Sequence, residues 1–351
     1  MKKFLVAIFA TLLLFGGLSA NAFGKKSADT LALVPTMNAE TSAQNRIWVG
    51  TFQLAWNELM DNFAKGPVEF SKYKSPVVDE LNAQSFKAAD ISENAYYAKF
   101  DKTSPELKKE IEEAIKAKFD EKSDILDSLD WSKGRGKYTA YAMLKKDFKF
   151  TKAFAKLKKE SFGKNRTKVA YFGINKESDT DLGSMVNVLF YNNPNDFAAA
   201  IKTEGKDVVY LYRTNDNKTF DKLYADMMKK HEVYTDESEF TSKDELKVPN
   251  IDLCKIQAFK ELENKKIKGT NLVIGTAVET VKFKIDNEGV KLKSEAAIMT
   301  KMTALRPEPT APRKLYFTDT FVMFLQESDK NVPYFAMRVA DVAALNKTAK
   351  K

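Results

Sequence analysis

The side chains that most often carry catalysis are scarce in this chain. His231 is its only histidine and Cys254 its only cysteine. A hydrolase with a nucleophile and a histidine base would have to use His231, but Lys229, Lys230 and Glu232 beside it are typical of an exposed helix end. One cysteine and one histidine exclude a zinc site of the usual ligands and an intramolecular disulfide. Cys254 is interpreted as a packed small side chain rather than a nucleophile.

Phosphate and carboxylate chemistry give no stronger signal. Residues 134–137 read Gly-Arg-Gly-Lys, but they lack the earlier glycine and the following Ser or Thr of a phosphate-binding loop, so a plain turn is expected. Asp and Glu number 48, too many to single out an acid and base pair, and a glycosidase is neither shown nor excluded. We therefore expect a protein that is not an enzyme and that uses no metal and no cofactor.

One stretch has a regular pattern that ordinary catalysis does not explain. Between Val290 and Ala304 the charged residues all stand at odd positions, namely Lys291, Lys293, Glu295 and Lys301. The even positions are uncharged throughout, so a strand here would have one uncharged face. Two interpretations follow: an ordinary strand of a sheet, or a segment that can be either an exposed loop or an inserted strand.

Helical patterns dominate the first part of the chain. Residues 51–64 carry an apolar face that ends at Gly66-Pro67. Ser75-Pro76 and Ser104-Pro105 each combine a cap residue with proline in the first turn, which predicts two further helices. In the second of these, the buried face is predicted from the spacing of four apolar residues, Leu107, Ile111, Ile115 and Phe119. Shorter helices are expected at 197–201 and 220–228.

Strand patterns dominate the second part. Strands are expected at 137–150, 169–172, 185–191, 208–212 and around 281–285, followed by a hairpin over 315–325 and 334–339. No repeat or low-complexity linker divides the chain, so one large α+β domain is predicted.

The ends of the chain have their own signals. Lys2 and Lys3, an apolar run and the small residues Ala20 and Ala22 predict a signal peptide over 1–22, and hence export to the periplasm or outside the cell. A flexible leader is expected over 23–45, the folded domain over 46–345 and a basic tail over 346–351. The formal net charge is +9, but the basic residues are interspersed with many acidic ones, which favours a surface of mixed charge over a nucleic-acid site. No later stretch is apolar enough for a membrane span.

Four motifs follow one another near the C-terminus: Asn287-Glu288-Gly289, Ser294-Glu295-Ala296-Ala297 with Thr300, residues 320–324 (TFVMF) and residues 335–339 (FAMRV). Their order resembles the hinge, reactive loop, strand and closing hairpin of the serpins. Residues 142–154 are similar to the family's strand that runs into a Trp-x-x-x-Phe element, with Phe150 and Phe154 in those places. Phe150 in place of Trp, Ala142 in place of Asn and Thr320 in place of Pro depart from the family pattern. The resemblance suggests a divergent bacterial member.

The resemblance implies a serpin-like single domain with a large central mixed or antiparallel sheet, further sheets, several helices and an exposed loop over 288–313. In the family a protease cleaves this loop, which then inserts as a strand and traps the acylated protease. The implied hinge residues are Glu288, Gly289, Ser294, Glu295, Ala296, Ala297 and Thr300, and the implied scissile region is Ala304, Leu305, Arg306 and Pro307. Because proline makes Arg306-Pro307 a poor substrate, cleavage after Ala304 or Leu305 is favoured, which indicates elastase- or chymotrypsin-like targets.

Three functions remain open from the sequence. The first is a monomeric inhibitor of a serine or cysteine endopeptidase. The second is a non-inhibitory protein of the same fold with a binding or chaperone role, favoured by Pro307 and by the bulky Ile298 and Met299 in the hinge. The third is an unrelated exported binding protein or enzyme whose late strands only mimic the serpin pattern.

Overall fold

The computed structural model describes residues 31–134, 136–178, 180–292 and 312–346. They form an α+β structure of several sheets and helices, as the sequence predicts. The helices are α1 (Gly50–Leu59), α2 (Pro76–Asn82), α3 (Pro105–Phe119) and α4 (Phe220–Glu232). No helix within the described ranges is long and apolar enough to cross a membrane.

A seven-stranded sheet lies at the centre. Its order is β1 (Leu31–Leu33), β2 (Asn45–Val49), β19 (Phe335–Val339), β18 (Phe321–Glu327), β10 (Asp207–Arg213), β9 (Asp196–Lys202) and β8 (Val186–Asn193). β1 and β2 are parallel, while the other neighbours are antiparallel. The sheet is therefore mixed. The predicted hairpin is its β18–β19 pair.

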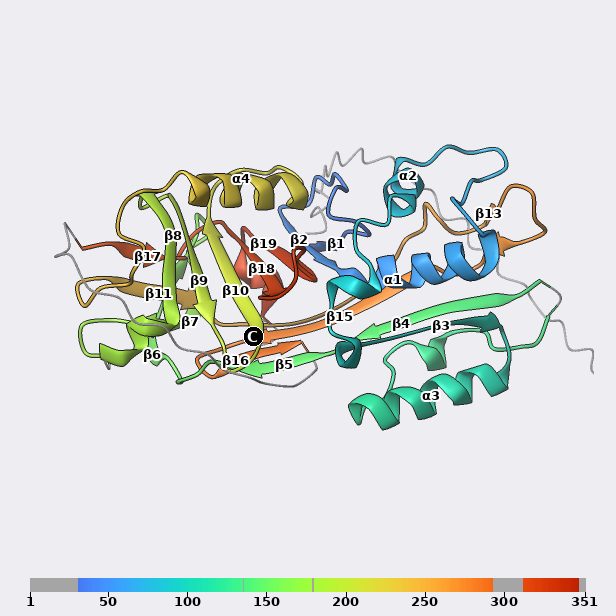
Figure 1. Ribbon diagram of the computed structural model, residues 1–351, viewed down its shortest axis with the longest axis horizontal. Coiled ribbons are helices and arrows are strands. Elements are labelled where there is room, and N and C mark those ends of the chain that lie inside the picture. The colour runs from blue at the N-terminus through green and yellow to red at the C-terminus, as the bar shows by residue number, and fades with distance from the viewer. Residues whose placement is uncertain (1–30, 135, 179, 293–311, 347–351) are drawn as a thin grey trace, which may run out of the picture.

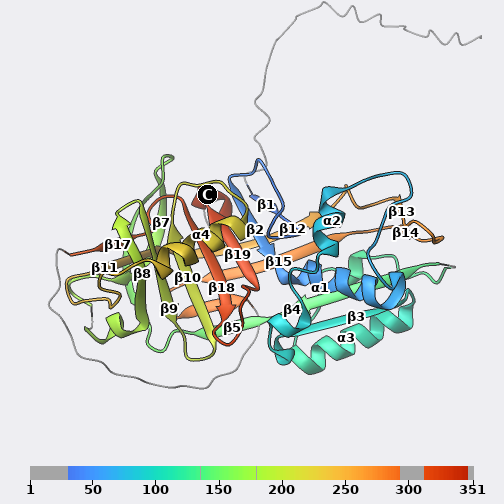
Figure 2. The same cartoon turned by 45° about the horizontal axis from the view of Figure 1, so that its top comes forward.

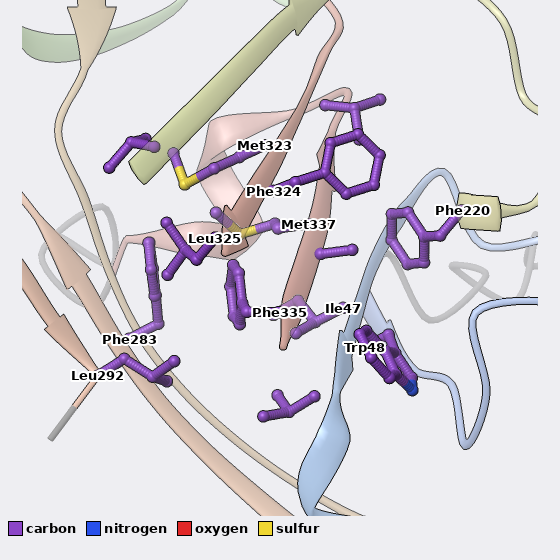
Figure 3. Close-up of a cluster of buried hydrophobic side chains, with 14 of the residues drawn as sticks. Ile47, Trp48, Phe220, Phe283, Leu292, Met323, Phe324, Leu325, Phe335 and Met337 are labelled. Carbon is purple, nitrogen blue, oxygen red and sulfur yellow. The ribbon is translucent and has the colours of Figure 1, made fainter. Parts of the chain in front are cut away.

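Both faces of this sheet are covered, which explains why every residue of β18 is buried. α4 lies on one face (Figure 1). Its Phe220 and Tyr224 rings pack against Phe324, with centroid distances of 6.3 and 5.2 Å. On the other face, Phe283 stacks on Phe335 at 4.7 Å (Figure 3). Burial of such side chains contributes about 1.5–3 kcal/mol each and defines the core.

Phe283 belongs to a second, four-stranded sheet, which is the one that positions the candidate site. Its order is β12 (Ile251–Ala258), β15 (Val278–Ile285), β16 (Gly289–Leu292) and β5 (Lys146–Lys149). A third sheet runs β17 (Lys314–Tyr316), β11 (Glu245–Pro249), β7 (Thr167–Ile174) and β6 (Ala155–Phe162). The short β13 (Lys265–Lys266) pairs with β14 (Val273–Ile274).

The last sheet is the pair β3 (Tyr96–Lys102) and β4 (Tyr138–Leu144), which lies between two helices (Figure 2). The turn that continues α1 brings Phe63 to 5.2 Å from the Tyr138 ring. On the opposite side, the predicted apolar stripe of α3 packs with Tyr141 in a small core of its own. α3 begins where the cap signal predicts, since Ser104 Oγ accepts a hydrogen bond from the Leu107 amide at 3.1 Å.

Two predictions about elements were wrong. Residues 197–201 form the middle of strand β9 rather than a helix. The Asn-Pro signal before them is a hairpin turn between β8 and β9, and the FAAAI sequence is buried on both faces of the central sheet, so tertiary packing overrides the helix preference of alanine. The flexible leader is wrong for residues 31–45, because β1 pairs with β2 and most of this segment is buried. Residues 1–30, which hold the expected signal peptide, lie outside the described ranges.

The base and the nucleophile considered from the sequence, His231 and Cys254, lie on different elements, α4 and β12. His231 is half-buried near the end of α4, with Nδ1 3.0 Å from the Leu189 carbonyl oxygen. Cys254 is exposed on β12, so its interpretation as a packed side chain was wrong. It occupies one of the outward positions of a strand whose inward positions, Ile251 and Leu253, are buried.

Candidate functional site: a strand junction beside the hinge

The turn between β15 and β16 is held from two directions. The Asp286 side chain accepts a hydrogen bond from the Glu288 amide at 2.9 Å, and the Asp286 amide donates to Gly289 O at 3.1 Å. The carbonyl oxygens of Asn287 and Glu288 accept hydrogen bonds from the amides of Phe154 and Phe150 at 2.8 and 2.9 Å. The Asn-Glu-Gly motif is therefore a fixed corner from which β16 starts.

β16 lies between β15 and β5 and is antiparallel to both. Val290 is opposite Ile285 on one side and opposite Phe148 on the other. Val290 and Leu292 are buried while Lys291 is exposed, so the uncharged even positions face the core. The predicted alternation is confirmed as far as Leu292, the last described residue before residues 293–311.

Gly289 has a specific steric role at this point. A Cβ atom added there would lie 2.1 Å from the carbonyl oxygen of Phe148 on β5. Real Cβ atoms do not approach backbone oxygens that closely, so only glycine lets the two strands pair at this position.

Beyond Leu292, two strand edges have no strand partner among the described residues. β15 pairs with β12 along its whole length, but its other edge pairs with β16 only at Lys284 and Ile285. β4, which precedes β5 in the chain and continues its line, pairs only with β3. Because β16 is antiparallel to both β15 and β5, these two open edges flank the continuation of its path. Unpaired edges of this kind are templates for an added strand.

A buried carboxyl group stands on the open part of β15. Glu279 is 4% exposed, and neither of its carboxyl oxygens has a hydrogen-bond partner among the described residues. Burial raises the pKa of Glu279 to about 8, which the backbone of Phe52 at the start of α1 opposes only in part. The Thr280 hydroxyl is also buried, and within the described ranges it has no hydrogen-bond partner. This part of β15 thus has buried polar groups whose hydrogen bonds are not satisfied by the described residues.

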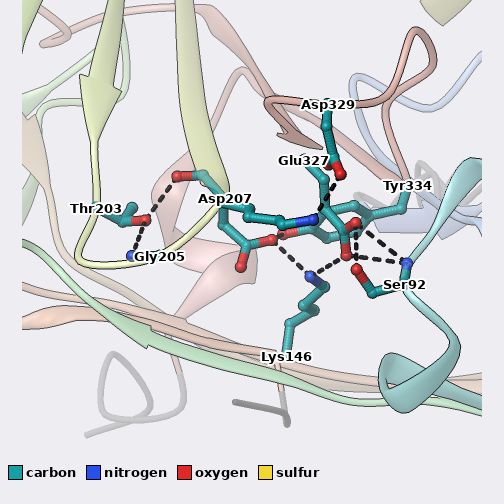
Figure 4. Close-up of polar contacts among 9 residues, drawn as sticks. Ser92, Lys146, Thr203, Gly205, Asp207, Glu327, Asp329 and Tyr334 are labelled. Carbon is teal, nitrogen blue, oxygen red and sulfur yellow. Dashed lines mark hydrogen bonds and ion pairs between the residues drawn. The ribbon is translucent and has the colours of Figure 1, made fainter. Parts of the chain in front are cut away.

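A buried ionic cluster lies where β16 ends, since Leu292 is opposite Lys146. Lys146 Nζ is 2.8 Å from Asp207 Oδ1 and 2.5 Å from Glu327 Oε1 (Figure 4). Tyr334 donates its hydroxyl to Asp207 and Ser92 donates to Glu327, at 2.8 and 2.7 Å. Burial raises the pKa of Asp207, and it acts on Glu327 in the same sense. For Glu327, hydrogen bonds from Lys146 and Ser92 outweigh burial and lower the pKa.

Of the predicted site residues, the structure describes Glu288 and Gly289 and brings them to the start of β16. The exposed loop expected over 288–313 is therefore wrong for residues 289–292, which are paired with β15 and β5. Ser294, Glu295, Ala296, Ala297 and Thr300 of the hinge, and Ala304 to Pro307 of the scissile region, lie outside the described ranges. Sequence reasoning missed Lys146, Asp207, Glu327 and Glu279. Three of them had a signal: Glu279 shares the inward parity of Val281 and Phe283, Lys146 shares that of Phe148, and Asp207 shares that of Val209.

No protein-family model matches the sequence, and no curated protein matches it. Among solved structures, the chain is similar to thyroxine-binding globulin in complex with thyroxine (12% identity, 67% of this chain, 64% of that chain, TM-score 0.42). It is also similar to Serpin48 of the insect Tenebrio molitor (14% identity, 84% and 74%, TM-score 0.42) and to human kallistatin (12% identity, 68% and 64%, TM-score 0.41).

The chain spans slightly less than two thirds of the thyroxine-binding globulin and kallistatin chains. At these TM-scores and identities, function has to be argued from this chain's own strands and side chains. The solved structures that the chain resembles include serpins, the family that its C-terminal motifs resemble.

Proposed function

We propose that this chain is an exported, monomeric, serpin-like inhibitor of a serine or cysteine endopeptidase that acts by cleavage and insertion of its 288–313 loop. One observation carries the proposal: β16 enters the sheet at the Glu288-Gly289 hinge, and beyond Leu292, its last described residue, the edges of β15 and β4 on either side of its path have no strand partner among the described residues. An inhibitor of this type needs a fixed corner, an entry point and strand edges that can accept an added strand, and the described residues support all three.

The observed register predicts which residues would meet after insertion. If the antiparallel register of β16 continued past Leu292, Ser294 would lie opposite Val281 of β15 and Leu144 of β4. Ala296 would lie opposite Glu279 and Ala142. Val281 and Glu279 are buried, so the inserted even positions would face the core and have to be uncharged. Ser294, Ala296 and Ile298 meet that condition.

The test is a protease panel. Purified protein is mixed with elastase-, chymotrypsin- and papain-like endopeptidases, and the products are separated in SDS. The proposal expects a covalent complex with at least one of them. Simple cleavage within residues 288–313 by every protease, with full protease activity retained, would refute inhibition.

A matched pair of variants separates insertion from mere cleavage. Ser294→Arg places a charge on the predicted inward face, where an unpaired buried charge costs several kcal/mol. It should convert the inhibitor into a substrate and lower the complex yield at least tenfold. Lys293→Glu changes a charge on the outward face and should keep the yield. Equal yields for the two variants would contradict the register.

The second candidate function is a non-inhibitory binding or chaperone-like role in the same fold. Bulky Ile298 and Met299 in the hinge and Pro307 after Arg306 favour it. Loop clipping distinguishes the two candidates, because insertion raises the melting temperature while a loop that stays outside the sheet leaves it nearly unchanged.

A further inference from the structure

Two buried arginines face each other across strands β2 and β19 at one end of the central sheet. Arg46 and Arg338 are directly opposite in the register, and they are 2% and 3% exposed. Neither has an ion-pair partner among the described residues. Their hydrogen bonds go to neutral oxygens, those of the Asn217 side chain and the carbonyl groups of Gln44, Asn215, Asp216 and Lys218.

The two buried positive charges of this arginine pair lack a compensating negative charge in contact with them among the described residues. Burial, together with the charge of Arg338, lowers the pKa of Arg46 to about 10. Asp216 is the carboxylate that acts on Arg338, but its Oδ2 atom is already 2.6 Å from Lys218 Nζ. Buried cations are stable when an anion compensates them, and within the described residues no carboxylate contacts Arg46.

A cavity of about 320 Å³ opens beside Arg46, at the first turn of α4. Its other lining side chains are mostly polar, and three of them, Lys218, Thr219 and Lys222, come from the α4 start. Glu40 also lines it, so the lining side chains carry three positive charges against one negative charge. The positive end of the α4 dipole adds to this field.

Two unmet hydrogen-bond donors in the lining side chains point to a ligand rather than to a merely polar surface. Arg46 Nε and the Thr219 hydroxyl are both buried, and neither has a hydrogen-bond partner in the part of the chain that the structure describes. Thr219 is the N-cap residue of α4, yet its side chain makes no capping hydrogen bond. Native structures leave few such groups unsatisfied, and those that remain often mark a missing ion or water.

From this geometry we propose an oxyanion site, in which a phosphate or sulfate group occupies the cavity between Arg46, Thr219 and Lys222. The anion neutralises the Arg46–Arg338 pair and accepts hydrogen bonds from the Thr219 hydroxyl and the lysine ammonium groups. The cavity is larger than a free oxyanion, so it also accommodates a phosphomonoester.

The test is titration of the whole protein with inorganic phosphate at constant ionic strength, followed by calorimetry and by thermal unfolding. Saturable binding is expected, with a melting temperature that rises with phosphate and not with chloride. Glycerol 3-phosphate is run in parallel: tighter binding of the ester identifies a phosphomonoester as the ligand class, and equal binding identifies the free ion.

Variants locate the site. Arg46→Gln could unfold the sheet, so Thr219→Val and Lys222→Ala carry the test, and each should weaken phosphate binding about tenfold. Lys229→Ala, exposed in the last turn of the same helix, is the matched control and should bind as the unmodified protein does. Absence of saturable phosphate binding, or unchanged affinity in both test variants, overturns the proposal and leaves the arginines as anchors of the 215–218 loop.

Discussion

The most direct test of the open strand junction is Glu279→Gln. Glu279 has its ordinary pKa of 4.5 in the unfolded chain but a pKa of about 8 in the folded protein, because burial without a partner disfavours the carboxylate. Below pH 4.5 both states hold the proton, so the group costs nothing. As the pH rises from 4.5 towards 8, the unfolded chain releases its proton first and the folded state loses stability.

The size of the effect follows from the two pKa values. Each pH unit between them costs about 1.4 kcal/mol, so ionisation lowers the free energy of unfolding by about 3 kcal/mol at pH 7 and by about 1 kcal/mol at pH 5. The amide that replaces the carboxyl group in Glu279→Gln cannot ionise. We therefore expect the variant to match the unmodified protein near pH 4.5 and to exceed its stability by about 3 kcal/mol at pH 7.

The assay is urea unfolding of both proteins at pH 5 and pH 7. Glu261→Gln, at an exposed position, is the control and should keep the pH dependence of the unmodified protein. If Glu279→Gln leaves that dependence unchanged, the carboxyl group is hydrated or paired, and the reasoning about an unmet polar group beside the junction is wrong.

Two further substitutions test the corner and the ionic cluster. Gly289→Ala should destabilise the protein by about 1–3 kcal/mol, because the new Cβ atom would collide with the carbonyl oxygen of Phe148. The control is Gly275→Ala, whose Cβ atom would have no neighbour within 4 Å and which should be neutral in the same urea assay. Equal effects of the two substitutions would mean that β16 does not pair with β5. Lys146→Met should cost about 3–5 kcal/mol at pH 7, because it leaves Asp207 and Glu327 buried without their cation. The control Lys206→Met breaks an exposed ion pair with Asp329 and should cost about 1 kcal/mol or less. A similarly small loss of stability in Lys146→Met would show that water reaches the buried cluster.

Local pattern predicted the parts of the site that depend on neighbouring residues. The alternation of charge after Gly289 gave the correct face for Val290, Lys291 and Leu292, because side chains in a strand alternate strictly between its two faces. The Ser-Pro signal and the i+4 spacing predicted α3 correctly, because the cap residue and the apolar stripe both belong to this one helix.

The remaining parts of the site depend on contacts between distant segments. Lys146 and Glu327 are 181 positions apart, and although Lys146 shares the inward parity of Phe148, the sequence around it does not show which carboxylates compensate its charge. β1 has three residues, too few to show a period, and its burial comes from β2. Residues 197–201 are apolar on both faces, so their pattern does not separate a buried strand from a helix.

The energetics of the junction indicate what would drive insertion. Each of the two open edges, Val278–Phe283 of β15 and Tyr138–Leu144 of β4, would form about one hydrogen bond per residue of an added strand, and each bond is worth roughly 1 kcal/mol. Ordering that strand costs roughly 1–2 kcal/mol per residue, so hydrogen bonds alone about offset the entropy. The surplus has to come from buried side chains, and in the proposed register Ile298 is the largest of the first inward residues. The bulk that could slow its entry is therefore also what would hold the inserted strand.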